Sequence, residues 1–143
     1  MGAMDLEELL RLNNRNMIGF DLALGSAAIL APSETLQVLG HRHPTADAEA
    51  LFRRCGPIWL TFAAAHAVAH LRGTEKDWAA LAWLRGTEIA TDALWSGSPG
   101  FERESARWAM RAAGVSNLAM ALGYGFLSRR VRRSEAAALA SAS

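Results

Sequence analysis

The stretch from Pro57 to Leu71 decides the fold, and it reads PIWLTFAAAHAVAHL. It is long enough for about four turns of helix and contains no Asp, Glu, Lys or Arg. A helix on the outside of a water-soluble bundle carries a charged face opposite its apolar stripe, and this helix has none. Its two histidines, His66 and His70, are four residues apart and share one side of the helix. The pattern predicts an apolar exterior and a narrow polar side that faces the interior of a bundle.

Three other hydrophobic segments have readable ends. Pro32 stops the first, Thr45 and Thr74 are suitable N-caps, and Gly73 closes the segment quoted above. The sequence Gly-Ser-Pro-Gly at 97–100 breaks the chain again. No stretch alternates as a strand does. The sequence predicts an all-α, up-down bundle of about four hydrophobic helices, at about residues 17–31, 56–71, 75–96 and 102–128.

Composition limits the possible classes of protein. The chain has 143 residues, of which 51% are hydrophobic and 20% charged, and its formal net charge is +1. We interpret residues 1–4 as an expression-vector scar, residues 5–133 as one helical domain and residues 134–143 as a flexible tail. The near-neutral charge gives no reason to expect nucleic acid as a partner. The single cysteine, Cys55, excludes an internal disulfide.

In these segments the polar residues occupy a narrow side and apolar residues cover the rest of the helix. This arrangement favours transmembrane helices, because lipid around the bundle explains why the polar side is narrow. The uncharged runs 55–71 and 112–128 are 17 residues long, the lower limit for a span of about 30 Å. The mean hydropathy of +0.07 is low for a membrane protein. A slight Lys and Arg excess beside both termini predicts a bacterial inner-membrane protein with cytoplasmic termini. The competing interpretation is a soluble cytoplasmic homo-oligomer. The arginines that follow the last segment could contact lipid headgroups.

The segment from Ile18 to Pro32, IGFDLALGSAAILAP, followed by VLG at 38–40, resembles the first span of small four-helix bacterial membrane proteins of the DoxX-like kind. These families share a glycine-rich first helix, a proline stop and a small loop. The resemblance covers about the first 40 residues and the general layout of four helices. It implies a membrane protein, and it assigns no catalytic residue.

The few polar residues of the hydrophobic segments form a candidate site. Arg85, Glu88 and Asp92 are spaced three and then four residues apart, on one side of their helix. The residues expected to be catalytic are Asp92, Glu88, Asp21, His66 and His70. Those expected to bind substrate are Arg85, Asn117, Trp59 and Tyr124.

Burial of several carboxyl groups in one apolar cavity would separate their pKa values. Desolvation raises a carboxyl pKa, and the charge of Arg85 lowers that of a neighbouring acid. One protonated and one ionised carboxyl can act together as general acid and general base. We therefore expect a cofactor-independent enzyme, a cyclase, an isomerase or an epoxide-opening catalyst, acting on a lipophilic small molecule. Membrane lipid is the other expected partner.

Simpler interpretations stand beside this one. Arg85, Glu88 and Asp92 could be a structural ion-pair network in a non-catalytic membrane protein or partner subunit, and Asp21 could simply be paired with Arg85. His66 and His70 have a spacing that can bind a metal, but no second motif accompanies them, and no metal is assigned. A Gly-rich nucleotide loop, a GxSxG motif and paired ExxH motifs are all absent from the sequence, so no cofactor is expected.

Overall fold

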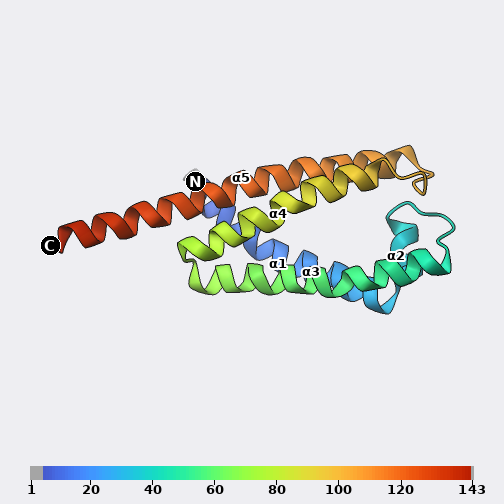
Figure 1. The fold of residues 1–143 in the computed structure, drawn as a ribbon, viewed down its shortest axis with the longest axis horizontal. Helices are drawn as coiled ribbons and strands as arrows, with labels where there is room; N and C mark the ends of the chain where they lie inside the picture. Colours follow the sequence, from blue (N-terminus) through green and yellow to red (C-terminus); the bar gives the residue numbers. More distant parts are fainter. Residues whose placement is uncertain (1–4, 143) are drawn as a thin grey trace.

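The computed structural model describes residues 5–142 of the chain, and residues 1–4, interpreted above as a scar, lie outside the described residues. Five α-helices follow one another, and no strand occurs between residues 5 and 142 (Figure 1). The helices are α1 Leu6–Leu30, α2 Pro32–Val38, α3 Ala46–Arg72, α4 Glu75–Ser96 and α5 Glu104–Ser141. The predicted all-α class is confirmed, as four long helices and the short α2.

The predicted caps at Thr45, Gly73 and Thr74 lie at helix ends, whereas α1 already begins at Leu6, before the hydrophobic segment predicted from about residue 17. Thr45 Oγ1 accepts a hydrogen bond from the backbone N–H of Ala48 (3.2 Å) at the start of α3. Thr74 begins α4 in a capping box with Asp77. Between these two helices, Gly73 adopts a φ of 61°, a left-handed conformation that glycine reaches without steric cost. The resulting tight turn makes α3 and α4 antiparallel neighbours.

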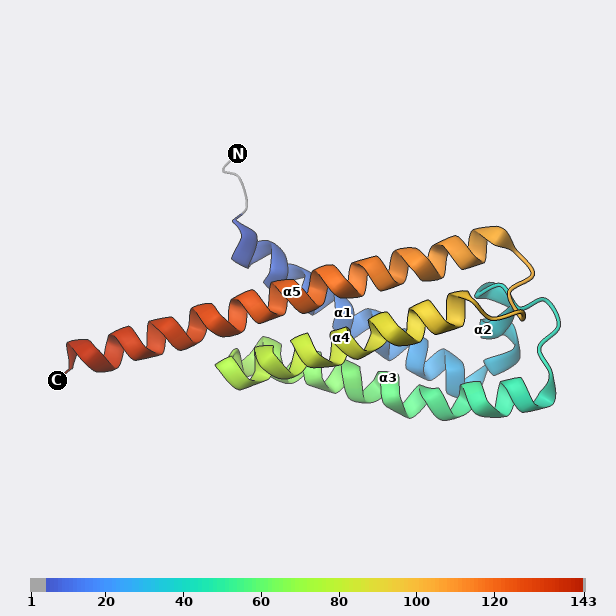
Figure 2. The same cartoon turned by 45° about the horizontal axis from the view of Figure 1, so that its top comes forward.

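The long helices are arranged as two pairs, α1 with α3 and α4 with α5, and contacts within each pair are more extensive than contacts between the pairs. Figures 1 and 2 show these pairs side by side, with α2 and the two long loops at one end of the bundle. At the other end α5 continues past the remaining helices (Figure 2). Side chains that point between the two pairs therefore come from all four long helices.

Glycine allows α1 and α3 to approach closely. A Cβ atom on Gly56 would lie 2.4 Å from Ile29 Cγ1 and 2.8 Å from the carbonyl oxygen of Gly25. Real Cβ atoms do not approach other heavy atoms so closely. Gly25, one of the small residues of the first hydrophobic segment, thus faces Gly56 across the helix pair.

The polar side chains lie inside, as the sequence predicted. The buried polar residues are Asn14, Asp21, His66, Arg85, Asp92, Ser96, Asn117 and Ser128. Many large apolar side chains are exposed, and they occur on every long helix; Leu30, Leu71, Leu94 and Val115 are examples. Within residues 5–142, no helix combines the length and the apolar composition needed to cross a membrane. The prediction of transmembrane helices therefore has no support in the fold.

The last helix is longer than its apolar sequence indicates. It continues through the arginines that follow Ser128 and ends at Ser141. Residues 134–141, predicted to belong to a flexible tail, are helical and exposed. Two ion pairs join the basic part of α5 to the rest of the bundle: Arg130 Nε lies 3.0 Å from Glu7 Oε2, and Arg132 Nη1 lies 3.8 Å from Glu75 Oε1.

Candidate functional site

Four buried polar side chains from three helices meet in the middle of the bundle. This central cluster consists of Asn14 and Asp21 on α1, His66 on α3 and Arg85 on α4, each at most 2% exposed. The Arg85 guanidinium donates through Nη2 to Asp21 Oδ2 and through Nε to His66 Nε2 (3.1 Å). Asn14 Nδ2 donates to the backbone carbonyl of His66 (3.1 Å). The buried charges are therefore paired and hydrogen-bonded, as a dry interior requires.

The hydrogen bonds determine the protonation state of His66. Arg85 can only donate, so His66 Nε2 accepts and the ring proton lies on Nδ1. Nδ1 then donates to Asn14 Oδ1, at 2.6 Å. Burial, and to a smaller extent the charge of Arg85, lower the pKa of His66 to about 3. The imidazole is therefore neutral at neutral pH, and both of its nitrogens are engaged within the cluster.

Arg85 pairs with Asp21, one of the two sets of partners that the sequence left open. The sequence places Glu88 and Asp92 on the same side of the helix, but the guanidinium pairs with Asp21 on α1. Burial raises the pKa of Asp21, and the charge of Arg85 opposes that rise. Asp21 Oδ2 receives the guanidinium, while Asp21 Oδ1 has no hydrogen-bond partner among the described residues.

Two apolar cavities lie between the helices, and the second of them adjoins this cluster. The first cavity has a volume of about 360 Å³ and lies among α2, α3 and α4, and its lining includes His41, Phe52 and Cys55. The second cavity has a volume of about 340 Å³ and is lined mainly by α1, α4 and α5, including Asp21, Arg85 and Asn117. Four side chains line both cavities: Trp59, Glu88, Asp92 and Trp95.

Glu88 and Asp92 are the acidic groups shared by the two cavities. They lie one helical turn apart on α4; Asp92 is buried, and Glu88 is partly buried. Among the described residues, neither carboxyl group forms an ion pair, because the nearby Arg85 is occupied by Asp21. Asp92 Oδ2 accepts a hydrogen bond from Asn117 Nδ2 on α5, at 2.8 Å.

The surroundings raise the pKa of both carboxyl groups. For Glu88 the main cause is burial, followed by the negative charge of Asp92; the charge of Arg85 and a hydrogen bond with the Trp59 side chain oppose the rise. For Asp92 burial again raises the pKa, while the hydrogen bond from Asn117 and then the charge of Arg85 oppose the rise. A donor on the neighbouring helix α5 thus supports the ionised form of Asp92. The negative charge of ionised Asp92 in turn disfavours ionisation of Glu88.

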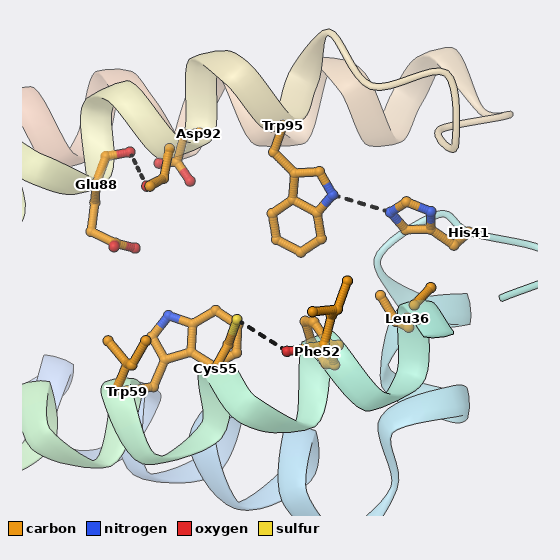
Figure 3. Close-up of a pocket in the computed structure, with 12 residues that line it drawn as sticks. Leu36, His41, Phe52, Cys55, Trp59, Glu88, Asp92 and Trp95 are labelled. Atoms are coloured by element: carbon orange, nitrogen blue, oxygen red, sulfur yellow. Dashed lines mark hydrogen bonds between the residues drawn. The ribbon is translucent and has the colours of Figure 1, made fainter. Parts of the chain in front are cut away.

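Aromatic rings form much of the first cavity. Phe52 and Trp59 on α3 have ring centroids 5.4 Å apart, and Phe52 and Trp95 lie 6.1 Å apart. Trp95 Nε1 donates to His41 Nε2 at 3.2 Å. Figure 3 shows the α3 side chains facing Glu88 and Trp95 across the space, with His41 at one end.

The predicted residues fall into two groups. Trp59, Glu88 and Asp92 line both cavities, and Asp21, Arg85 and Asn117 line the second. His66 and Tyr124 line neither: Tyr124 is fully buried in an apolar cluster, and its hydroxyl accepts a hydrogen bond from Asn13 Nδ2 (3.0 Å). Both side chains are buried in the core.

The prediction that His70 faces the interior is wrong. His70 is exposed in the last turn of α3, whereas His66 is buried. A separation of four residues rotates a side chain by about 40° around a helix, which takes His70 off the narrow buried side.

In the described part of the chain, no group of three or more His, Cys, Asp or Glu side chains is placed to hold a metal ion.

Asn14 and the aromatic cavity were not predicted from the sequence. Asn14 stands in a run of polar residues, but it lies seven residues before Asp21 and therefore on the same face of α1. The same spacing joins Phe52 to Trp59 and Glu88 to Trp95. A separation of seven residues places two side chains on one face of a helix, and this spacing could have predicted both Asn14 and the aromatic cavity.

No family model, curated protein or solved structure matches this chain. The resemblance to DoxX-like proteins therefore stays an expectation from the sequence, and the functional argument depends on the site alone.

Proposed function

We propose that this protein is a cofactor-independent acid–base enzyme that acts on a lipophilic small molecule as a cyclase, an isomerase or an epoxide-opening catalyst. One observation carries the proposal: Glu88 and Asp92 lie one helical turn apart, without an ion-pair partner among the described residues, and both line two apolar cavities. Structural carboxylates in such surroundings are normally paired.

The two carboxyl groups have different roles. Asp92 is the general base, because Asn117 donates a hydrogen bond to its ionised form. Glu88 is the general acid, because burial and the charge of Asp92 raise its pKa and favour the protonated form. Asp92 takes a proton from the substrate at one position, and Glu88 gives a proton at another. The net result is an isomerisation or ring closure that consumes no other reactant.

The surroundings suit an apolar substrate with few polar atoms. The cavities are lined mainly by aliphatic and aromatic side chains, with Trp59 between them. Two buried oxygens, Asp21 Oδ1 and Asn117 Oδ1, have no hydrogen-bond partner among the described residues and belong to side chains that line the second cavity. A hydroxyl group on the substrate would satisfy one of them. Arg85 acts as a positioning residue, since its charge moderates the pKa of both acids.

A substrate-independent probe tests the proposal. A carboxylate base in an apolar cavity accelerates the ring opening of 5-nitrobenzisoxazole. The base removes the C–H proton, the released electron pair forms the nitrile, and the N–O bond breaks to give a coloured phenolate. We expect saturable turnover by the wild-type protein, faster than by acetate at the same pH. Asp92→Asn should lower the rate by about 10²–10⁴-fold, the usual contribution of a positioned base.

The comparison needs a charge-matched control that keeps both the fold and the proposed base. Glu135→Gln on the exposed part of α5 removes the same charge far from the cavities and should leave the rate unchanged. Melting temperatures measured on the same preparations separate lost chemistry from lost folding. Equal rates for wild-type and folded Asp92→Asn protein would overturn the proposal.

A second candidate function is non-catalytic: a partner subunit whose polar interior only fixes the packing. The hydrogen bonds that join Asn14, His66 and Arg85 favour it, because such a network specifies how helices fit together. This interpretation predicts that Asp92→Asn and Glu88→Gln lower the melting temperature. It also predicts that the wild-type protein does not accelerate the benzisoxazole reaction.

We also propose that the exterior contacts membrane lipid, with a homo-oligomer as the alternative. Exposed apolar side chains on every long helix support lipid, since a dimer interface would gather them on one face. Purification should then require detergent or lipid. A monodisperse monomer in plain buffer would contradict lipid contact, and a monodisperse dimer would favour the oligomer. A bacterial inner-membrane location, or alternatively a cytoplasmic one, depends on that outcome.

A further inference from the structure

The first cavity combines aromatic walls with an acidic group. Phe52 and Trp59 come from α3, and Trp95 comes from α4. In Figure 3 the carboxyl group of Glu88 extends from α4 into the space between these helices, toward the side that carries Trp59. Tryptophan presents the most electron-rich ring face of any side chain, and it attracts a cation within about 6 Å.

Positive charge is missing from the same lining. No Lys or Arg is among the residues that line the first cavity. His41, its one basic side chain, is neutral, because burial lowers the pKa of His41 and its Nε2 accepts the hydrogen bond from Trp95. The guanidinium of Arg85, whose charge reaches Glu88, is paired with Asp21, and that of Arg54, whose charge reaches Cys55, lies outside the lining. The cavity is therefore apolar, aromatic and acidic, without a cation of its own.

We propose that the first cavity binds a lipophilic organic cation, an alkyl- or arylammonium, whose charge lies beside Glu88 and against the rings of Trp59 and Trp95. Its volume of about 360 Å³ accommodates a small aromatic amine. The proposal goes beyond the acid–base function, because it concerns equilibrium binding and requires no turnover.

Cation binding is coupled to release of a proton. Glu88 must be ionised to pair with the ligand, and its pKa is raised in the free protein. The titratable groups around Glu88 are Asp21 on α1, Cys55 on α3, Arg85 and Asp92 on α4, and His41 in the loop after α2. Of the residues on α5 that line the cavities, none is titratable. Affinity should therefore fall as the pH drops through the raised pKa of Glu88, since protonation removes the charge that the ligand needs.

Calorimetry with two isosteric probes tests this directly. Benzyltrimethylammonium carries a permanent charge, and neopentylbenzene has the same shape without it. We expect the wild-type protein to bind the cation at least about tenfold more tightly at neutral pH, the preference that cation–π and carboxylate contacts supply in a dry site. Equal affinities for the two probes, or no binding of the cation, would overturn the proposal.

Variants locate the binding. Glu88→Gln keeps the shape of the side chain and should remove the preference for the charged probe as well as its pH dependence. Trp59→Leu should weaken the cation more than the neutral probe, and Glu135→Gln is the charge-matched control. A preference that survives in Glu88→Gln would also overturn the assignment. If the wild-type protein opens the benzisoxazole ring but does not bind the cation, only this inference is wrong. If it binds the cation but does not open the ring, only the proposed function is wrong.

Discussion

Arg85 on α4 and Asp21 on α1 form an ion pair across the interior, with side chains only 3% and 1% exposed. The pair joins the α1–α3 layer to the α4–α5 layer at a point where neither charge meets water. It also explains why Glu88 and Asp92, on the same helix as Arg85, have no ion-pair partner among the described residues. The pairing of Arg85 with Asp21 thus accounts both for the buried contact between the two helix pairs and for the absence of an ion-pair partner at Glu88 and Asp92 among the described residues.

Asp21→Asn should destabilise the protein severely. The amide leaves the Arg85 guanidinium buried without a counter-charge, and breaking a buried pair from one side costs about 3–5 kcal/mol. Urea unfolding followed by circular dichroism measures this. The double variant Asp21→Asn/Arg85→Met should recover part of the loss, because it removes the stranded charge. A double variant less stable than Asp21→Asn alone would contradict this account of the pair.

His66 makes a contribution to stability that depends on pH. Its pKa lies at about 3 in the folded protein and at 6.5 without burial. The unfolded chain therefore binds the proton first on acidification. The contribution of His66 is complete above about pH 6.5, and it is lost as the pH falls toward 3, with a slope of at most about 1.4 kcal/mol per pH unit.

Urea unfolding between pH 3 and pH 7 should show this slope in the wild type and lose it in His66→Gln. The glutamine offers one acceptor and one donor, so it can replace both ring hydrogen bonds. Asp21, Glu88 and Asp92 have raised pKa values and the opposite sign: their contributions weaken as the pH rises. They remain in the variant, so the difference between the two proteins isolates His66. An unchanged slope would show that His66 is not held neutral.

The sequence could predict the helices because their ends are local. Thr45 and Thr74 begin helices through bonds to backbone groups three residues away, and Gly73 ends one through its own φ. The inward direction of Asp92 and His66 could be predicted as well, from the absence of any other polar side. Each of these inferences uses neighbours within one helix.

The partners could not be predicted, because they lie on different helices. The sequence left Arg85 with two possible sets of partners, Glu88 and Asp92 or Asp21, and the pair with Asp21 depends on how α1 and α4 cross, which no single helix encodes. His70 was misplaced because the four-residue step from His66 rotates the side chain off the buried side, which in the same turn is occupied by the fully buried Ala69. The width of the buried side cannot be read from the spacing of two histidines.

The close approach of α1 and α3 gives a prediction with an internal control. Gly56→Ala should destabilise by about 1–3 kcal/mol, because the new methyl group would overlap Ile29 and the backbone of Gly25. Gly86→Ala on α4 meets nothing within 4 Å and should stabilise by about 0.5–1 kcal/mol through helix propensity. The two variants thus shift the melting temperature in opposite directions. Stabilisation by Gly56→Ala would show that the helices can separate freely there.

The hydrogen bond from Asn117 to Asp92 makes the proposed base measurable through pH. The benzisoxazole rate should rise with pH as Asp92 ionises and reach a plateau above its pKa. In Asn117→Leu, the ionised carboxyl loses its donor, so the pKa of Asp92 and the midpoint of the profile should both rise. The variant is then slower than the wild type on the acidic limb and approaches it on the plateau. Ser116→Ala, which alters the adjacent residue in the lining of the second cavity, should leave the midpoint in place. A midpoint that falls in Asn117→Leu, or one that does not move, would mean that Asp92 is not the group whose ionisation limits the rate.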